Sequence, residues 1–163
     1  MNSLLSRRGS TGTLRVVPSR LYGANPFDRS RSNQPRGKTF ILSADDEPLT
    51  LLTRQAILER SGYEVLSAAD GCEALDIFAA HYVDLAILDY QMPRLDGAAV
   101  AREIKRLRPR LPILMVSGLL IEDDVKECVD SLFIKGQNPK LLLCEMERLL
   151  ASSKFCARAA AGF

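Results

Sequence analysis

Short apolar runs alternate with amphipathic stretches from about residue 38 to residue 152, and this alternation restricts the possible folds more than any other feature. Several of the runs are apolar at consecutive positions, as expected for strands of a parallel sheet that helices cover on both faces. The predicted strands are residues 39–44, 63–68, 84–88, 112–116 and 132–134. Strict alternation favours right-handed crossovers, so the sequence predicts an α/β fold with one open, doubly wound parallel sheet.

The stretches between the strands carry apolar residues at helical spacing, together with signals that begin and end helices. Pro48, Asp70 and Pro139 stand at three expected helix starts. Segment 119–128 is short, acidic and weakly amphipathic, so the fourth helix is predicted to be short or irregular. The predicted apolar faces consist of Leu49, Leu52 and Ala56 in the first helix, Leu75, Phe78 and Tyr82 in the second, Val100, Ala101, Ile104 and Leu107 in the third, and Leu142, Met146, Leu149 and Leu150 in the last.

The amino-terminal segment differs in composition from the rest of the chain. Residues 1–38 hold eight Lys and Arg against one acidic residue, whereas residues 39–163 hold fourteen against nineteen. Because the segment also lacks a sustained hydrophobic period, residues 1–37 are expected to form a disordered basic arm. The alternatives for this arm are an organellar transit peptide, a weak contact with nucleic acid or acidic membrane, and a plain solvated tail. The folded domain is expected at 38–152, followed by a tail at 153–163.

Composition argues against several other classes of protein. A chain of 163 residues that is 47% hydrophobic and 26% charged is expected to be soluble, with one well-buried core. No apolar run approaches the roughly 20 residues of a membrane helix, and we expect neither a membrane span nor a secretory signal. The four cysteines lie at wide, irregular intervals, which argues against zinc and disulfide frameworks and favours a cytoplasmic location.

Charged and hydroxyl side chains follow four of the five predicted strands. Asp45 and Asp46 follow the first, Asp89 the third, Ser117 the fourth and Lys135 the fifth. In an open parallel sheet the carboxyl ends of the strands share one edge, where ligands bind. Each residue alone has an ordinary explanation as a cap, a turn or a solvated side chain, but their coincidence predicts a site.

Three carboxylates at that edge would repel one another, at about 4 kcal/mol for two charges about 4 Å apart in an effective dielectric of 20. Oxygen ligands and a site open to water suit Mg²⁺. A carboxylate can also act as a nucleophile toward phosphorus when nearby positive charge neutralises the phosphoryl oxygens. Mg²⁺, Lys135 and Ser117 are the groups expected to supply that neutralisation, which makes Asp89 a candidate phosphoryl acceptor.

The chain closely resembles the receiver domains of two-component response regulators over about residues 38–152. The residues that carry the resemblance are Asp45-Asp46, the string from Leu88 to Gly97 that reads LDYQMPRLDG, the pair Ser117-Gly118, and Lys135. The resemblance implies a flavodoxin-like fold with strand order 2-1-3-4-5. It also implies a module of a two-component or phosphorelay system that accepts a phosphoryl group from a histidine kinase or phosphotransfer protein and then loses it slowly, without being an autonomous enzyme.

The resemblance also assigns roles to individual residues. Asp89 would be the phosphoacceptor, and Asp46, Asp89 and the backbone carbonyl of Gln91 would bind Mg²⁺, with Asp45 acting through water. Lys135 would pair with the phosphoryl group, and Ser117 would move to bond it. Output through an unidentified partner protein is expected, because only about eleven residues follow the last predicted helix, which indicates a stand-alone receiver without an output domain.

Several positions depart from the family's usual pattern. Gly136 follows Lys135 where the family usually has a cis proline, and a cis bond to a residue other than proline costs roughly 2.5–4 kcal/mol, so a trans bond is expected. Leu132 stands where an aromatic residue is usual, and Phe133 is expected on the opposite side of its strand. Gly118 stands where Ala is common. Seventeen residues separate Ser117 from Lys135, which shortens the fourth helix.

Two other functions are compatible with the same sequence. A receiver fold used as a fixed scaffold, without regulated phosphorylation, would also explain the departures at Leu132 and Gly136. A phosphohydrolase with an Asp nucleophile would need a second Asp two residues later, where this chain has Gln91. His81 is expected to be an ordinary surface residue at the end of the second helix.

Overall fold

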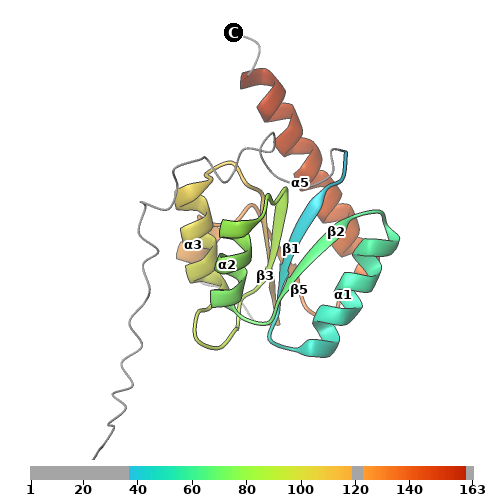
Figure 1. Cartoon of the computed structure of the whole chain (residues 1–163), viewed down its shortest axis with the longest axis vertical. Coiled ribbons are helices and arrows are strands. Elements are labelled where there is room, and N and C mark those ends of the chain that lie inside the picture. The colour runs from blue at the N-terminus through green and yellow to red at the C-terminus, as the bar shows by residue number, and fades with distance from the viewer. Residues whose placement is uncertain (1–36, 119–122, 161–163) are drawn as a thin grey trace, which may run out of the picture.

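The computed structural model describes residues 37–118 and 123–160, so most of the expected basic arm lies outside the described residues. Strands and helices alternate along the chain, as the sequence predicts (Figure 1). The strands are β1 (Phe40–Ala44), β2 (Glu64–Ala68), β3 (Leu85–Asp89), β4 (Ile113–Ser117) and β5 (Ser131–Ile134). The helices are α1 (Pro48–Arg60), α2 (Gly71–Ala80), α3 (Gly97–Leu107), α4 (Asp123–Lys126) and α5 (Pro139–Ala160).

All strand pairs are parallel, and the sheet has the order β2-β1-β3-β4-β5. The predicted doubly wound α/β fold and the order 2-1-3-4-5 are therefore confirmed. The register pairs Ala44 of β1 with Ala68 on one side and Leu88 on the other. Because β1 and β3 are neighbours at the same level, the residues that follow Ala44 and Leu88 meet at one edge of the sheet.

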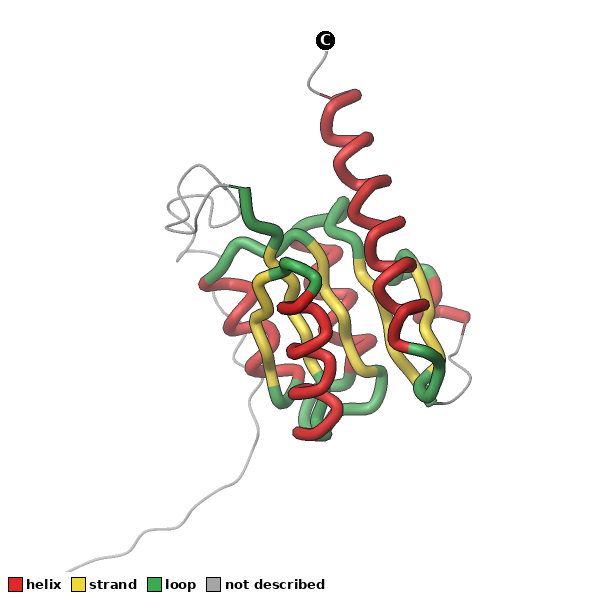
Figure 2. The backbone as a smooth tube through the Cα atoms, turned by 90° about the vertical axis from the view of Figure 1, so that its right-hand side faces the viewer, coloured by secondary structure: helices red, strands yellow, loops and turns green. Residues whose placement is uncertain are grey.

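Helices cover both faces of the sheet, so the buried apolar residues form two clusters. One cluster lies under α1 and α5 and includes Ile41, Leu58 and Met146. The other lies under α2 and α3 and includes Leu42, Phe78 and Ile104. Figure 2 shows the sheet between the two helical layers. Every residue of β1, β3 and β4 is buried, which explains why these strands read as continuous apolar runs.

The buried face of α1 differs from the predicted one. Leu49 and Leu52 are 72% and 62% exposed, and Ala56 is also exposed, whereas Arg54 and Leu58 are buried. The predicted face was wrong because it was assigned from apolar residues alone, without considering that a charged residue could face the core. Arg54 turns inward because its guanidinium pairs with the buried Asp45, and this leaves the two leucines in solvent.

The other long helices bury most of the predicted faces. Phe78 of α2, three residues of α3 and all four predicted residues of α5 are buried, whereas Leu75 and Leu107 are half-buried at the edge of the core. Asp70 caps α2, accepting hydrogen bonds from the backbone N–H groups of Cys72 and Glu73 at 2.8 and 3.0 Å. Tyr82 lies beyond the end of α2, because the chain becomes extended at His81. His81 is exposed, as expected.

The fourth and fifth helices are the shortest and the longest of the described helices. Helix α4 has four residues, which confirms the short fourth helix, although residues 119–122 of the predicted segment lie outside the described part of the chain. Helix α5 has 22 residues and runs past residue 152, where we expected the folded domain and the last helix to end. Its last turns, rich in the helix-favouring Ala, extend beyond the sheet (Figure 1). Among the described residues, no helix has the length and apolar character needed to span a bilayer.

The two faces of α1 provide a matched test of the packing. Leu58→Ala removes a fully buried side chain, and the free energy of unfolding is expected to fall by about 2–5 kcal/mol. Leu52→Ala makes the same change on the exposed face and is expected to alter it by less than about 0.5 kcal/mol. Urea unfolding followed by circular dichroism measures both. Equal losses in the two variants would show that α1 does not pack in this orientation.

Candidate functional site

Three carboxylates meet where β1 and β3 end. Asp45 and Asp46 follow β1, Asp89 is the last residue of β3, and one carboxylate oxygen from each lies within 4.8 Å of the others. Asp45 and Asp89 are buried, at 0% and 2% exposure, whereas Asp46 is exposed. The register of β1 with β3 produces this arrangement, so the three aspartates come together as the sequence analysis expected.

Lys135 reaches the same point from the turn after β5. Its Nζ lies 2.8 Å from Oδ2 of Asp89 and 3.5 Å from Oδ2 of Asp45. Its backbone N–H donates to the carbonyl oxygen of Ser117 at 2.8 Å, which fixes the start of the β5–α5 turn beside the end of β4. The described residues contain no cis peptide bond, so the Lys135–Gly136 bond is trans, and Gly136 has φ +88°. The turn therefore places the lysine at the carboxylates with a glycine in the left-handed region.

Ser117 and Gln91 lie near the ends of the neighbouring strands β4 and β3. Ser117 ends β4, is 3% exposed, and lies one residue beyond the Val116 that pairs with Asp89. Gln91 is exposed and follows β3. A cleft of about 430 Å³ opens beside it, lined by Asp46, Tyr90, Gln91, Met92, Pro93 and Asp96. The cleft gives the exposed side of the carboxylate cluster access to solvent.

The surroundings shift the pKa values of both members of the central ion pair. Burial has the largest effect on Asp89 and raises its pKa; the hydrogen bond from Lys135 opposes this rise, and the negative charge of Asp45 adds to it. For Lys135, burial acts to lower the pKa of the ammonium group, but the hydrogen bond to Asp89 and the charges of both aspartates outweigh it and raise the pKa. Lys135 is therefore a protonated counter-charge at neutral pH.

Arg54 is the residue at this site that the sequence analysis missed. Its guanidinium donates to Oδ2 of Asp45 at 2.8 Å and to Oγ of Ser43 at 3.2 Å, and the residue is only 5% exposed. One signal was available in the sequence. Arg54 lies on the same helical stripe as Leu51 and Leu58, and an arginine there is buried only with an acidic partner.

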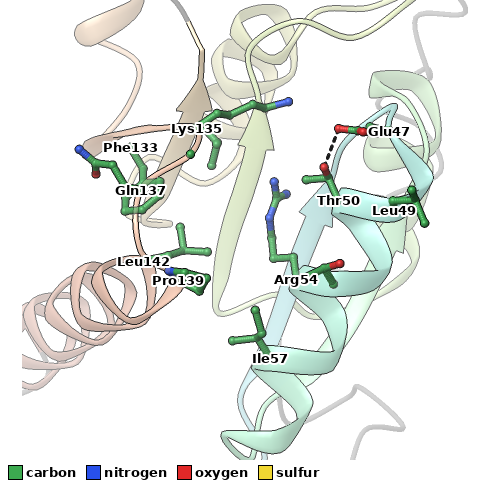
Figure 3. Close-up of a pocket in the computed structure, with 13 residues that line it drawn as sticks. Glu47, Leu49, Thr50, Arg54, Ile57, Phe133, Lys135, Gln137, Pro139 and Leu142 are labelled. Carbon is green, nitrogen blue, oxygen red and sulfur yellow. Dashed lines mark hydrogen bonds between the residues drawn. The ribbon is translucent and has the colours of Figure 1, made fainter.

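A second cavity of about 430 Å³ lies between α1 and the β5–α5 turn (Figure 3). Thr50, Arg54 and Ile57 line it from α1, and Phe133, Lys135 and Leu142 line it from the other side. Figure 3 shows Arg54 and Lys135 reaching the upper part of this cavity from opposite walls. The two cationic side chains therefore come from elements far apart in the sequence and meet at Asp45.

Comparison with known proteins identifies the family. A family model described as a response regulator receiver domain matches residues 41–133, which is more than half of the chain. The chain belongs to the response regulator receiver family. The sequence resemblance and the carboxylate geometry thus point to the same family.

Two curated relatives of this receiver are transcriptional regulators by their names. A probable transcriptional regulator ycf27 of Cyanidium caldarium is 35% identical over 129 residues, covering 75% of this chain and 50% of the relative. The alkaline phosphatase synthesis transcriptional regulatory protein PhoP of Bacillus subtilis is 33% identical over 121 residues, covering 72% of this chain and 50% of PhoP. The chain spans about half the length of these relatives.

Solved receiver structures have the same fold. A CheY-like receiver domain protein from Methanospirillum hungatei superposes with a TM-score of 0.67 at 28% identity, covering 72% of this chain and 97% of that one. The response regulator TrrA from Thermotoga maritima, solved in complex with Mg²⁺ and BeF, superposes with a TM-score of 0.65 at 31% identity, covering 68% and 98%. These coverages correspond to a whole receiver domain.

The side chains of β5 show how this receiver departs from the family pattern at Leu132. Leu132 and Ile134 are 39% and 58% exposed, whereas Phe133 packs against the cluster under α1 and α5. The aromatic ring therefore lies on the opposite side of β5 from Leu132, as expected. This receiver has a small apolar surface at a position where the family usually has a ring.

Gly97 and Gly118 allow a matched test of how closely α3 approaches the backbone of Asp89. A Cβ at Gly97 would lie 2.0 Å from the backbone oxygen of Asp89, whereas a Cβ at Gly118 would have no atom within 4 Å. Gly97→Ala is expected to lower the free energy of unfolding by about 1–3 kcal/mol, because backbone must shift to admit the methyl group. Gly118→Ala is expected to change it by less than about 0.5 kcal/mol. Urea unfolding separates the two, and equal stabilities would contradict the close approach of α3 to Asp89.

Proposed function

We propose that this receiver accepts a phosphoryl group on Asp89 with the help of Mg²⁺ and signals through a partner protein. The observation that supports it best is the convergence of three carboxylates, two of them buried, with the Lys135 ammonium 2.8 Å from Asp89. In the proposed assignment Asp46, Asp89 and the backbone carbonyl of Gln91 bind the metal ion, and Asp45 contacts it through water. The family and the motif string support the same assignment.

The residues at this edge fit a magnesium ion. All the candidate ligands are oxygen atoms, and the exposed Asp46 and the neighbouring cleft leave room for the water ligands that Mg²⁺ retains. The cluster also has an excess of negative charge that a divalent cation would balance. When bound, Mg²⁺ would supply positive charge to the phosphoryl oxygens during transfer.

The protein's own residues have distinct parts in the proposed transfer. A carboxylate oxygen of Asp89 forms the new P–O bond, while the bond from phosphorus to the donor breaks and the donor keeps that electron pair. Lys135 orients the Asp89 carboxylate beforehand and pairs with the phosphoryl oxygens afterwards. Ser117, at the end of the adjacent strand, is the proposed hydroxyl donor to the phosphoryl group. Hydrolysis of the acyl phosphate by water later restores the carboxylate.

The proposed donors and output follow from this chemistry. The proposed donor is a phosphohistidine of a histidine kinase or phosphotransfer protein. Asp89 accepts one phosphoryl group and must lose it by hydrolysis before it can accept another, so the receiver does not act as an autonomous enzyme. Adding a phosphoryl group changes the charge at the point where Lys135 links β3, β4 and β5. The surface formed by α4, β5 and α5 is the proposed output face, and its partner remains to be identified.

Intact mass spectrometry tests the acceptor directly. Incubation with acetyl phosphate and MgCl₂ is expected to add one phosphoryl mass to the wild-type protein, and Asp89→Asn or chelation of the metal is expected to prevent the gain. Asp76→Asn, which makes the same change on the exposed surface of α2, is expected to leave the gain intact. A gain that survives Asp89→Asn would overturn the assignment.

The exposed Leu132 and the four-residue α4 favour one alternative, a receiver fold that serves as a fixed scaffold. The scaffold has no need of a phosphoryl group, so it predicts no mass gain with acetyl phosphate. It also predicts that Asp89→Asn leaves binding to a partner unchanged. A stable phosphoryl gain on Asp89 contradicts the scaffold.

A further inference from the structure

Arg54 is a buried charge that the proposed phosphorylation chemistry does not use. It comes from the middle of α1, is 5% exposed, and contacts two groups of β1 and its end, Ser43 and Asp45. A guanidinium carries a positive charge and only donates hydrogen bonds. The site therefore contains a second cation beside the Lys135 ammonium.

Both carboxylate oxygens of Asp45 already have hydrogen-bond or ion-pair partners within the protein. Oδ2 accepts from Arg54 at 2.8 Å and lies 3.5 Å from Nζ of Lys135. Oδ1 accepts from the backbone N–H of Glu47 at 3.1 Å. Both oxygens of Asp45 thus have donors within the protein, so a metal ion must share them with groups already in place.

The formal charges at the site lead to the same conclusion. Three carboxylates and two cationic side chains leave the cluster at −1, whereas the cluster without Arg54 would be at −2. Even at the dielectric of water, a unit charge acting on a divalent ion a few ångströms away corresponds to about a tenfold change in affinity. Arg54 therefore opposes the ion by its own charge and by its hold on Asp45.

We infer that Arg54 is a positioning residue that weakens divalent-cation binding by the unphosphorylated receiver. This inference rests on the metal site of the proposed function and adds a regulating residue to it. Phosphorylation replaces the single negative charge of Asp89 with about two, and this brings the metal-loaded cluster close to neutrality. Arg54 thus lowers metal affinity by the same electrostatic contribution in both states, and the resting protein, which lacks the additional phosphoryl charge, is left with the weaker binding.

Manganese titration of the unphosphorylated 163-residue chain tests the inference, with free Mn²⁺ followed by electron paramagnetic resonance. Arg54→Met is expected to bind Mn²⁺ roughly tenfold more tightly than the wild type. Arg54→Lys keeps the charge and is expected to stay within about twofold of the wild type. Arg60→Met makes the same change at the exposed end of α1 and is expected to have no effect. Asp46→Asn should weaken binding in every background, which confirms the site being titrated.

If Arg54→Met folds, as circular dichroism checks, Mn²⁺ binding equal to or weaker than that of the wild type overturns the inference. Removing one member of a buried pair can prevent folding, and if Arg54→Met does not fold, a second pair of variants decides the question. Asp45→Asn and the double variant Asp45→Asn/Arg54→Met differ only in the arginine. Tighter Mn²⁺ binding by the double variant supports a direct effect of Arg54, and equal binding overturns it.

The same titration separates this inference from the proposed phosphorylation. No phosphodonor is present, so the order of Mn²⁺ affinities is obtained whether or not Asp89 accepts a phosphoryl group. A second titration in the presence of beryllofluoride, which mimics a phosphoryl group on a carboxylate, repeats the comparison with more negative charge at Asp89. Arg54→Met is again expected to bind Mn²⁺ roughly tenfold more tightly than the wild type, and equal affinities of the two proteins would overturn the inference.

Discussion

Two buried carboxylates that need positive charge determine much of this structure. Asp45 and Asp89 lie side by side because β1 and β3 pair in parallel, and neither is exposed enough for water to stabilise its charge. Lys135 meets this need from the β5–α5 turn, and Arg54 meets it from α1. The orientation of a helix, the position of a turn and the chemistry of the site therefore follow from one electrostatic constraint.

This constraint explains which parts of the structure the sequence could predict. The strands follow from hydrophobic runs, and most of the buried faces of α3 and α5 follow from helical spacing, since apolar burial is the dominant force in each case. The order of the strands was predicted from the resemblance to receiver domains. The predicted buried face of α1 was wrong because the ion pair of Arg54 with Asp45 outweighed the burial of Leu49 and Leu52. A single sequence offers little warning of such an exchange, because the partner of Arg54 is recognisable only once Asp45 is known to be buried.

Some features of the candidate site could likewise be predicted from the sequence, and others could not. Asp45, Asp46, Asp89, Ser117 and Lys135 could be identified because each follows a predicted strand, and strand ends have a common location in an open parallel sheet. The close approach of Gly97 to the backbone of Asp89 could not be predicted from spacing, because it depends on the distance between α3 and β3. The length of α5 was underestimated, because the prediction ended it at residue 152 with its last apolar positions, Leu149 and Leu150, whereas the helix runs to Ala160.

The position of Lys135 links its ion pair with Asp89 to local opening of the sheet at β5. Strand β5 has four residues and lies at the edge of the sheet, where β4 is its one neighbour among the described strands, and its Leu132 and Ile134 are 39% and 58% exposed. Edge strands with few buried contacts are among the first parts of a domain to open locally. The counter-charge of Asp89 is therefore attached to one of the least protected strands of the sheet. By thermodynamic linkage, whatever strengthens the Lys135–Asp89 contact protects this edge from opening, and opening of the edge exposes the Asp89 carboxylate without its partner.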